Sequence, residues 1–314
     1  MKVLVTGGAG FIGSHVSKRL LDRGDDVTII DNFDDYYDRE LKAKNLNTIP
    51  EAEIHIGDIK HQSWMKDAFT IDKPDVVVHL AAMAGVRHSL EYPEYHSDVN
   101  ITGTVNLLKL ATEFGVENFV FASSSSIYGD RTNIPFKETD RVDEPISPYA
   151  ASKKAGELFG SVYSSQHGLN FTALRFFTVY GPRSRPDMAH RKFADGMREG
   201  KTIQLYNNGK NGRDYTFIDD IVDGVVAALE NPHRYEIFNL GGDKPVLTTE
   251  LVSELERGLD IEAKKEYVEK QTGDVDITCA DISKAKRMLG YERKVSFKKG
   301  MEKFCDWYKQ EYKI

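Results

Sequence analysis

The chain has 314 residues, of which 40% are hydrophobic and 29% charged, and its 42 basic and 49 acidic residues leave a formal net charge of −7. Without a basic excess, a nucleic-acid partner is not expected, because phosphates are neutralised by Lys and Arg. Two cysteines offer neither a disulfide framework nor a zinc ligand set, so a reducing, cytoplasmic compartment is expected. No apolar stretch approaches the roughly 18 residues of a membrane span, so no membrane partner is expected.

In the first half of the chain, short runs rich in Val and Ile alternate with segments of helical periodicity. Each run is predicted to be a strand buried on both faces, because apolar residues follow one another without alternation. The runs are 2–6, 27–31, 53–57, 75–80, 118–123 and 171–176, and long helices are predicted at 11–23, 99–114 and 148–166. Such β-α repeats predict an α/β fold with a Rossmann-type doubly wound parallel sheet.

The pattern changes after Gly181-Pro182, where polar residues become more frequent. Turns are predicted at 207–209 and 211–212, and a short strand at 235–240. Helices are predicted at 219–229, 248–258, 281–289 and 297–308. We therefore divide the chain into a first domain, residues 1–178, and a smaller, irregular C-terminal domain, residues 179–314, with segment 214–240 as a candidate to return to the main sheet.

The first predicted strand runs into the sequence GGAGFIG. Gly8, Gly10 and Gly13 match G-x-G-x-x-G, and Gly7, Gly10 and Gly13 match G-x-x-G-x-x-G. Glycines here let the backbone turn tightly and approach a pyrophosphate at the N-terminus of the following helix. Because the motif lies between a strand and a helix, it predicts that the first domain binds a dinucleotide.

Asp31 ends the second predicted strand, in the position where a carboxylate accepts hydrogen bonds from both ribose hydroxyls of adenosine. Such a carboxylate repels a 2′-phosphate, and residues 32–35 (Asn-Phe-Asp-Asp) include no cation to pair with one. NAD is therefore predicted rather than NADP. Asp58, after the third strand, is a candidate contact for adenine.

Tyr149 and Lys153 are four residues apart at the start of a predicted helix, so they share one face. The same spacing at Tyr206 and Lys210 spans a turn and is not expected to be functional. Because an unperturbed tyrosine has a pKa of about 10, Tyr149 needs the charge of Lys153 and of a bound nicotinamide to act as a base near neutral pH.

Four serines, 123–126, lie at the carboxyl end of the fifth predicted strand, the edge where ligands bind in open α/β sheets. A serine there can hydrogen-bond a substrate hydroxyl and the carbonyl that forms from it. His79, at the end of the fourth strand, is expected to be buried with satisfied hydrogen bonds. No metal is predicted.

Together these residues resemble the extended short-chain dehydrogenase/reductase family, and within it the nucleotide-sugar epimerases. The resemblance covers essentially the whole chain. It rests on TGGAGFIGSH (6–15), HLAA (79–82), SSSSIYG (123–129), SPYAASK (147–153), RFFTVYGPR (175–183) and GRDYTFIDDI (212–221). Segment RPDMA (185–189) resembles the signature of UDP-glucuronate 4-epimerases.

The resemblance implies an isomerase that performs NAD-dependent 4-epimerisation of a UDP-hexuronate, UDP-glucuronate to UDP-galacturonate, through a transient 4-keto sugar. It implies Ser124, Tyr149 and Lys153 as catalytic residues. The residues expected to bind NAD are Gly7, Gly10, Phe11, Ile12, Gly13, Asp31, Asn32, Asp58, Ile59, Leu80, Ala81, Ala82, Asn100, Tyr149, Lys153 and Phe176. Those expected to bind the UDP-sugar are Ser125, Ser126, Thr178, Arg185, Arg213 and Asp274, and many neutral-sugar epimerases carry Asn where Thr178 stands.

A uronate substrate imposes a requirement of its own. Oxidation at C4 turns it into a β-keto acid, which loses CO₂ when the carboxylate bond aligns with the carbonyl, so the carboxylate must be fixed by hydrogen-bond donors and a cation. Arg185 is the predicted cation, because its planar fork suits a carboxylate. Arg183 is its rival, and a surface pairing of Arg185 with Asp187 is the other alternative.

Three other functions stay open at this point. A UDP-glucose/UDP-galactose 4-epimerase uses the same chemistry on a neutral sugar. Related dehydratases and decarboxylases carry an acidic residue after the catalytic Ser/Thr, where this chain has Ser125 and Ser126. Non-enzymatic NAD-binding sensors usually lose the Tyr or the Lys, and this chain keeps both.

A homodimer is also expected. The predicted helices 99–114 and 148–166 carry more apolar residues than one face of the sheet needs, and the resembling family pairs these helices in an intermolecular four-helix bundle. The apolar residues concerned are Leu107, Leu108, Leu110, Ala111, Ala151, Ala155, Leu158 and Phe159.

Overall fold

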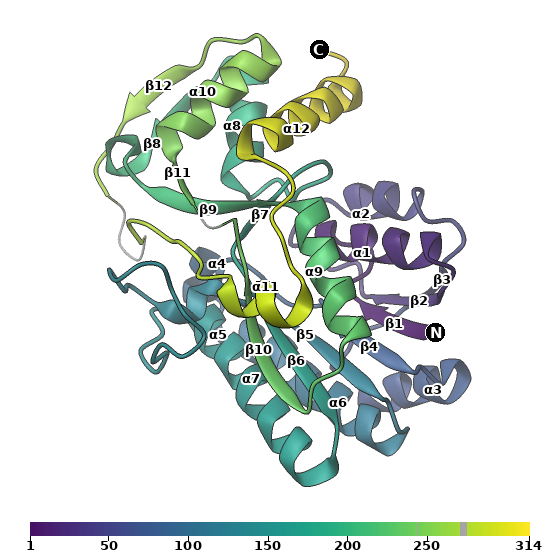
Figure 1. The fold of residues 1–314 in the computed structure, drawn as a ribbon. Helices are drawn as coiled ribbons and strands as arrows, with labels where there is room; N and C mark the ends of the chain where they lie inside the picture. Colours follow the sequence, from purple (N-terminus) through teal and green to yellow (C-terminus); the bar gives the residue numbers. More distant parts are fainter. Residues whose placement is uncertain (243, 271–274) are drawn as a thin grey trace.

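The computed structural model describes residues 1–242, 244–270 and 275–314 (Figure 1). A seven-stranded parallel sheet has the order β10-β6-β5-β4-β1-β2-β3. Its strands are β1 (Lys2–Thr6), β2 (Asp26–Asp31), β3 (Glu53–Ile56), β4 (Val76–His79), β5 (Asn118–Ser124), β6 (Asn170–Phe176) and β10 (Tyr235–Leu240). The order reverses between β1 and β4, so the switch point where doubly wound sheets bind ligands lies at their carboxyl ends.

Helices cover both faces of this sheet (Figure 1). On one face lie α1 (Phe11–Asp22), α2 (Arg39–Leu46), α9 (Ile218–Glu230) and α11 (Ser283–Leu289). On the other lie α3 (Gln62–Asp72), α6 (Gly103–Glu113) and α7 (Pro148–His167), with the short helices α4 (Val86–Glu91) and α5 (Pro93–Ser97) and a π-helical turn (Asp98–Thr102) leading into α6. In β1, Val3 and Val5 belong to one hydrophobic core and Leu4 to the other, which explains the unbroken apolar run. The predicted Rossmann-type sheet is confirmed.

Strand β3 differs from its prediction. Segment 53–57 is not buried on both faces, because Ile54 is 38% and Ile56 71% exposed. The physical reason is its place at the edge of the sheet, where β2 is its one neighbouring strand.

The C-terminal part of the chain forms a smaller unit at one end of the sheet (Figure 1). It contains a three-stranded sheet of β7 (Thr178–Tyr180), β9 (Gly212–Phe217) and β11 (Pro245–Leu247), and a two-stranded sheet of β8 (Thr202–Leu205) and β12 (Lys264–Tyr267). Helices α8 (Ala189–Arg198), α10 (Thr248–Leu259) and α12 (Phe297–Tyr312) complete it, with a 3₁₀ turn at Tyr206–Gly209. Strand β10 pairs with β6 of the main sheet, whereas β9 belongs to the smaller unit. The domain boundary after residue 178 stays a prediction.

The helix α6 residues expected at a dimer interface are used inside the chain. Leu107, Leu108, Leu110 and Ala111 are fully buried between α6 and the sheet. This part of the dimer prediction is wrong, because the apolar face of α6 is buried against the parallel sheet of the same chain. Among the described residues, no helix is both long and apolar enough to cross a membrane.

Candidate active site

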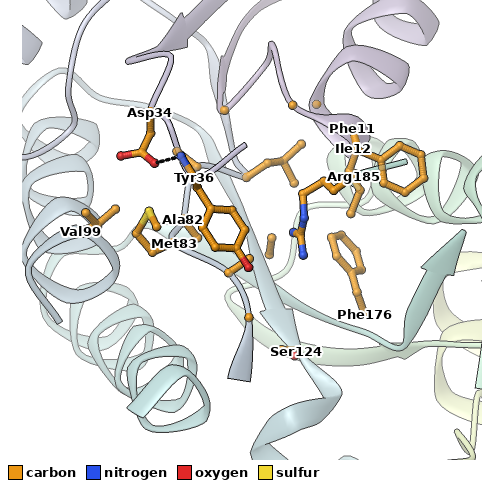
Figure 2. Close-up of a pocket in the computed structure, with 18 of the residues that line it drawn as sticks. Phe11, Ile12, Asp34, Tyr36, Ala82, Met83, Val99, Ser124, Phe176 and Arg185 are labelled. Atoms are coloured by element: carbon orange, nitrogen blue, oxygen red, sulfur yellow. Dashed lines mark hydrogen bonds between the residues drawn. The ribbon is translucent and has the colours of Figure 1, made fainter. Parts of the chain in front are cut away.

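A cavity of about 390 Å³ lies at the carboxyl edge of the main sheet (Figure 2). Its walls come from the glycine loop after β1, the ends of β2, β4, β5 and β6, the first turns of α7, and segment 176–188. The cavity therefore lies at the switch point expected from the strand order.

The glycine loop forms a cradle that larger residues would fill. Gly7 has φ of 71°, in the left-handed region that favours glycine, and a Cβ on Gly13 would come within 2.2 Å of the Gly7 carbonyl oxygen. The N-terminus of α1 begins after Gly10 with no side-chain cap, so its backbone N–H groups remain for a ligand. This arrangement fits a pyrophosphate, and with it a dinucleotide such as NAD.

Asp31 is fixed at the end of β2 by two backbone donors, the Ala9 N–H at 3.2 Å and the Phe33 N–H at 2.9 Å. Lys42, on α2, places its Nζ 3.5 Å from the Asp31 Oδ1. The expectation that no cation stands beside Asp31 is therefore wrong, because it considered residues 32–35 and the cation comes from the following helix. Asn32 donates to the Asp58 carboxylate at 3.2 Å, so the structure brings these two predicted residues together.

The predicted catalytic residues converge from two elements. Ser124 is the last residue of β5, and Ser147 starts α7 by accepting a hydrogen bond from the Ala150 N–H at 3.1 Å. This cap places Tyr149 in the first helical turn, where it hydrogen-bonds Ser124. Lys153, one turn further, donates to the Ala122 carbonyl at 2.8 Å, and its Nζ lies 5.9 Å from the centre of the Tyr149 ring.

The electrostatics of this group differ from the expectation. Burial raises the pKa of Tyr149 above its ordinary value, opposed by the hydrogen bond to Ser124 and the charge of Arg185 and assisted by Asp187. Burial also lowers the pKa of Lys153 to about 7. The protein side chains alone therefore do not lower the pKa of Tyr149 through Lys153, because burial is the largest influence on both groups.

Arg185 points into the cavity, close to Phe176 and the start of α1 (Figure 2). Its Nε and Nη2 donate to the two carboxylate oxygens of Asp187 at 2.9 and 3.0 Å. The alternative pairing with Asp187 is thus real; both side chains are partly buried, and Arg185 lines the cavity. Tyr36, which the sequence did not single out, donates to Asp187 at 3.2 Å.

Arg183 lies elsewhere. Its Nη1 donates to the Thr48 hydroxyl at 2.6 Å, and it lines a separate cavity of about 150 Å³. It is absent from the described residues that line the larger cavity. Of the two arginines, Arg185 is therefore the one that lines the cavity with Tyr149.

Most other predicted residues line the larger cavity, while Asn100 and Arg213 do not. The lining residues include Phe11, Ile12, Ile59, Leu80, Ala81, Ala82, Ser125, Ser126, Phe176 and Thr178. Asn100 is buried behind the wall, where its amide bonds both backbone groups of Met83 at 2.8 and 2.9 Å. Asn100 therefore supports the wall through Met83, and its direct contact with a cofactor stays a prediction. Arg213, at the start of β9, donates to the Gly212 carbonyl at 2.9 Å, and Asp274 lies outside the described residues.

Two further buried groups support the site. His79 has its Nδ1 2.7 Å from the Thr6 hydroxyl and its Nε2 2.9 Å from the Thr104 hydroxyl, and burial lowers its pKa to about 3. It is the satisfied neutral histidine that the sequence indicated. Glu157 and Arg175, which the sequence did not single out, form a bidentate ion pair behind Ser123. Nε and Nη2 of Arg175 donate to the two Glu157 carboxylate oxygens at 2.8 and 2.9 Å, and neither side chain is more than 1% exposed.

Residues 3–241 match the profile of the NAD dependent epimerase/dehydratase family. The chain belongs to this family. A UDP-glucuronate 4-epimerase of Thermodesulfobacterium geofontis is 44% identical over 315 residues, which cover 99% of this chain and 97% of that protein. Two solved structures have the same TM-score of 0.93, and each alignment covers 99% of this chain and 100% of the other. One is the UDP-glucuronic acid 4-epimerase of Bacillus cereus with UDP-glucuronic acid and NAD, at 35% identity, and the other the UDP-glucose 4-epimerase of Thermotoga maritima with UDP-glucose, at 32%.

Family membership agrees with the glycine cradle and with the Ser124, Tyr149 and Lys153 group. Family membership leaves the identity of the sugar open, because the fold matches a uronate epimerase and a neutral-sugar epimerase equally well. The residues around the sugar must therefore decide the substrate.

Proposed function

We propose that this protein is an NAD-dependent UDP-glucuronate 4-epimerase, an isomerase that interconverts UDP-glucuronate and UDP-galacturonate. The observation that carries the proposal is the Arg185 guanidinium in the cavity wall, near enough to Tyr149 to affect its pKa. A cation beside the catalytic tyrosine suits a sugar that bears a carboxylate. The 44% identity to a protein named UDP-glucuronate 4-epimerase, over nearly the full length of both, supports the same substrate.

The chemistry assigns one role to each catalytic side chain. NAD, held by the glycine loop and Asp31, would supply the hydride acceptor and donor for C4 of the sugar. Tyr149, as phenolate, takes the proton of the 4-hydroxyl and later gives it back, so no proton is gained or lost over a cycle. Ser124 hydrogen-bonds the same sugar oxygen. Lys153, when protonated, stabilises the phenolate of Tyr149 by its positive charge.

The carboxylate must be held while C4 is a ketone. Ser125, Ser126 and Thr178 line the cavity and offer hydroxyl donors. Arg185 supplies the cation, and its present partner Asp187 is itself a carboxylate, which accepts hydrogen bonds from Nε and Nη2 of the guanidinium. We assign these four residues to the sugar carboxylate, where they oppose decarboxylation. Arg213 is assigned to the UDP phosphates and Asp274 to the uridine ribose.

A homodimer is proposed from the exposed face of α7. Leu158 is 55%, Phe159 37% and Val162 52% exposed, and Ala151 and Ala155 continue the stripe toward the start of the helix. Apolar residues that recur every three or four positions suit helix–helix packing between subunits. A cytoplasmic location is proposed from the two cysteines, both buried as thiols.

The test is conversion of two substrates by the purified protein, followed by NMR of the sugar protons. UDP-glucuronate is expected to give UDP-galacturonate, with UDP-glucose turned over far more slowly. Faster conversion of UDP-glucose would favour the neutral-sugar epimerase, and a UDP-pentose product would favour a decarboxylase.

A further inference from the structure

Lys42 and Asp31 form a buried ion pair at the edge of the cavity. The Lys42 Nζ lies 3.5 Å from the Asp31 Oδ1, and the two side chains are 8% and 5% exposed. Both residues line the cavity. A buried ammonium is costly unless its charge is balanced and its N–H groups meet acceptors, so the surroundings of Lys42 indicate what it binds.

The protein satisfies this ammonium only in part. An ammonium has three donors, and Asp31 is the one carboxylate within ion-pair distance among the described residues. The Tyr37 ring, whose centre is 5.2 Å from the Nζ, adds a weaker cation–π contact. Donors of Lys42 therefore remain for a ligand in the cavity.

Helix α2 holds Lys42 in this position. Asp38 caps the helix by accepting from the Glu40 N–H at 2.9 Å, and Asn45 donates to the Ala9 carbonyl of the glycine loop at 2.9 Å. Lys42 and Asn45 are three residues apart, so they share the helix face that meets the loop. Lys44 on the same helix is 58% exposed and pairs with Glu311 at the surface.

We propose that Lys42 binds the adenosine ribose of NAD together with Asp31, and that Asp31 suppresses a latent affinity of Lys42 for a 2′-phosphate. Asp31 accepts from ribose hydroxyls while Lys42 donates to a ribose oxygen, and the pair is neutral, so it suits an uncharged 2′-hydroxyl. Without the carboxylate, Lys42 is a cation at the place of the 2′-substituent. The inference rests on the proposed use of NAD.

Calorimetric titration with two cofactor fragments, ADP-ribose and 2′-phospho-ADP-ribose, tests this proposal without any turnover. We expect Lys42→Met to weaken the binding of ADP-ribose by about tenfold or more, which is the loss expected for a charge-assisted hydrogen bond. Lys44→Met removes the same charge from the same helix and is expected to bind ADP-ribose like the wild type. Lys42→Gln repeats the test if Lys42→Met does not fold.

The double variant isolates the role of Asp31. Asp31→Ser is expected to bind 2′-phospho-ADP-ribose at least about tenfold more tightly than the wild type, for the same reason. This gain is expected to vanish in Asp31→Ser/Lys42→Met. Persistence of the gain in the double variant, or wild-type binding of ADP-ribose by Lys42→Met, would overturn the proposal. Failure of the wild type to bind ADP-ribose would instead contradict the proposed function.

Discussion

At the scale of single residues, we propose that Tyr149 carries the proton transfer. Its hydroxyl forms a hydrogen bond with Ser124 at the carboxyl end of β5. Removal of an acid/base group of this kind lowers the rate by about 10²–10⁴-fold. Tyr149→Phe is expected to lose UDP-glucuronate turnover by that factor while its melting temperature and affinity for NAD stay near those of the wild type. A variant that kept more than about a third of the wild-type rate would remove Tyr149 from this role, given that range.

Arg185 is expected to determine the preference for a uronate. A charge-assisted hydrogen bond contributes about 1.5–3 kcal/mol, so Arg185→Ala should lower kcat/KM for UDP-glucuronate by roughly ten- to a hundredfold. The loss for UDP-glucose should be smaller, because that sugar has no carboxylate. Arg183→Ala, which removes the same charge from the neighbouring cavity, is the matched control and should keep the wild-type rate. Equal losses on both substrates would contradict the assignment.

Lys153 gives the stability of the cofactor-free protein a pH dependence. Burial lowers its pKa from 10.5 to about 7, so between these values the unfolded chain holds a proton that the folded protein has released. Folding is therefore favoured as the pH rises through this window. The melting temperature of the wild type should rise relative to that of Lys153→Met between pH 7 and about pH 10. A difference that stays constant over this range would show that burial does not shift this group.

At the scale of elements, the Glu157–Arg175 pair joins α7 to β6 behind the proposed catalytic residues. Glu157 also accepts from the Ser123 hydroxyl at 2.7 Å, so the ion pair fixes the end of β5 against the helix that carries Tyr149 and Lys153. Removal of one partner of a buried pair costs about 3–5 kcal/mol, because the other charge stays buried without compensation. Urea denaturation should show this loss for Arg175→Met and a smaller one for Arg175→Met/Glu157→Leu. A single variant as stable as the wild type would contradict this account.

The elements also show how far the sequence can predict the site. The glycine loop, the serine run at the end of β5 and the start of α7 are local patterns, so spacing alone predicts Gly13 and Tyr149 as site residues, while the choice of Ser124 within residues 123–126 depends on the family resemblance. Helix α2 is short and polar, and its buried residues are Lys42 and Asn45, so it has no apolar periodicity that would predict a helix. Its contribution to the cavity depends on a contact with the glycine loop, which is a tertiary event.

Long-range contacts account for the other differences. Asn100 hydrogen-bonds Met83, and Asp187 hydrogen-bonds Tyr36, although the partners of each pair lie far apart in the sequence. Neither pair has a spacing signal. The exposure of β3 likewise depends on which strand ends the sheet, and a run of apolar residues does not carry that information.

At the scale of the whole molecule, the exposed stripe on α7 predicts a dimer. Burial of Leu158 and Val162 against a second copy would remove apolar surface from water, at about 25 cal/mol per Å². Light scattering at micromolar concentration should therefore give the mass of a dimer. Leu158→Glu/Val162→Glu should give a monomer that keeps its fold, and a monomeric wild type would contradict the interface.

In the proposed reaction, hydride leaves C4 of a UDP-uronate and returns to the same carbon within one cavity. The most direct test is conversion of UDP-glucuronate carrying deuterium at C4, in ordinary water, with NMR and mass analysis of the product. We predict UDP-galacturonate that keeps both its deuterium at C4 and its carboxylate. Product with solvent hydrogen at C4, or release of CO₂ in step with turnover, would contradict it.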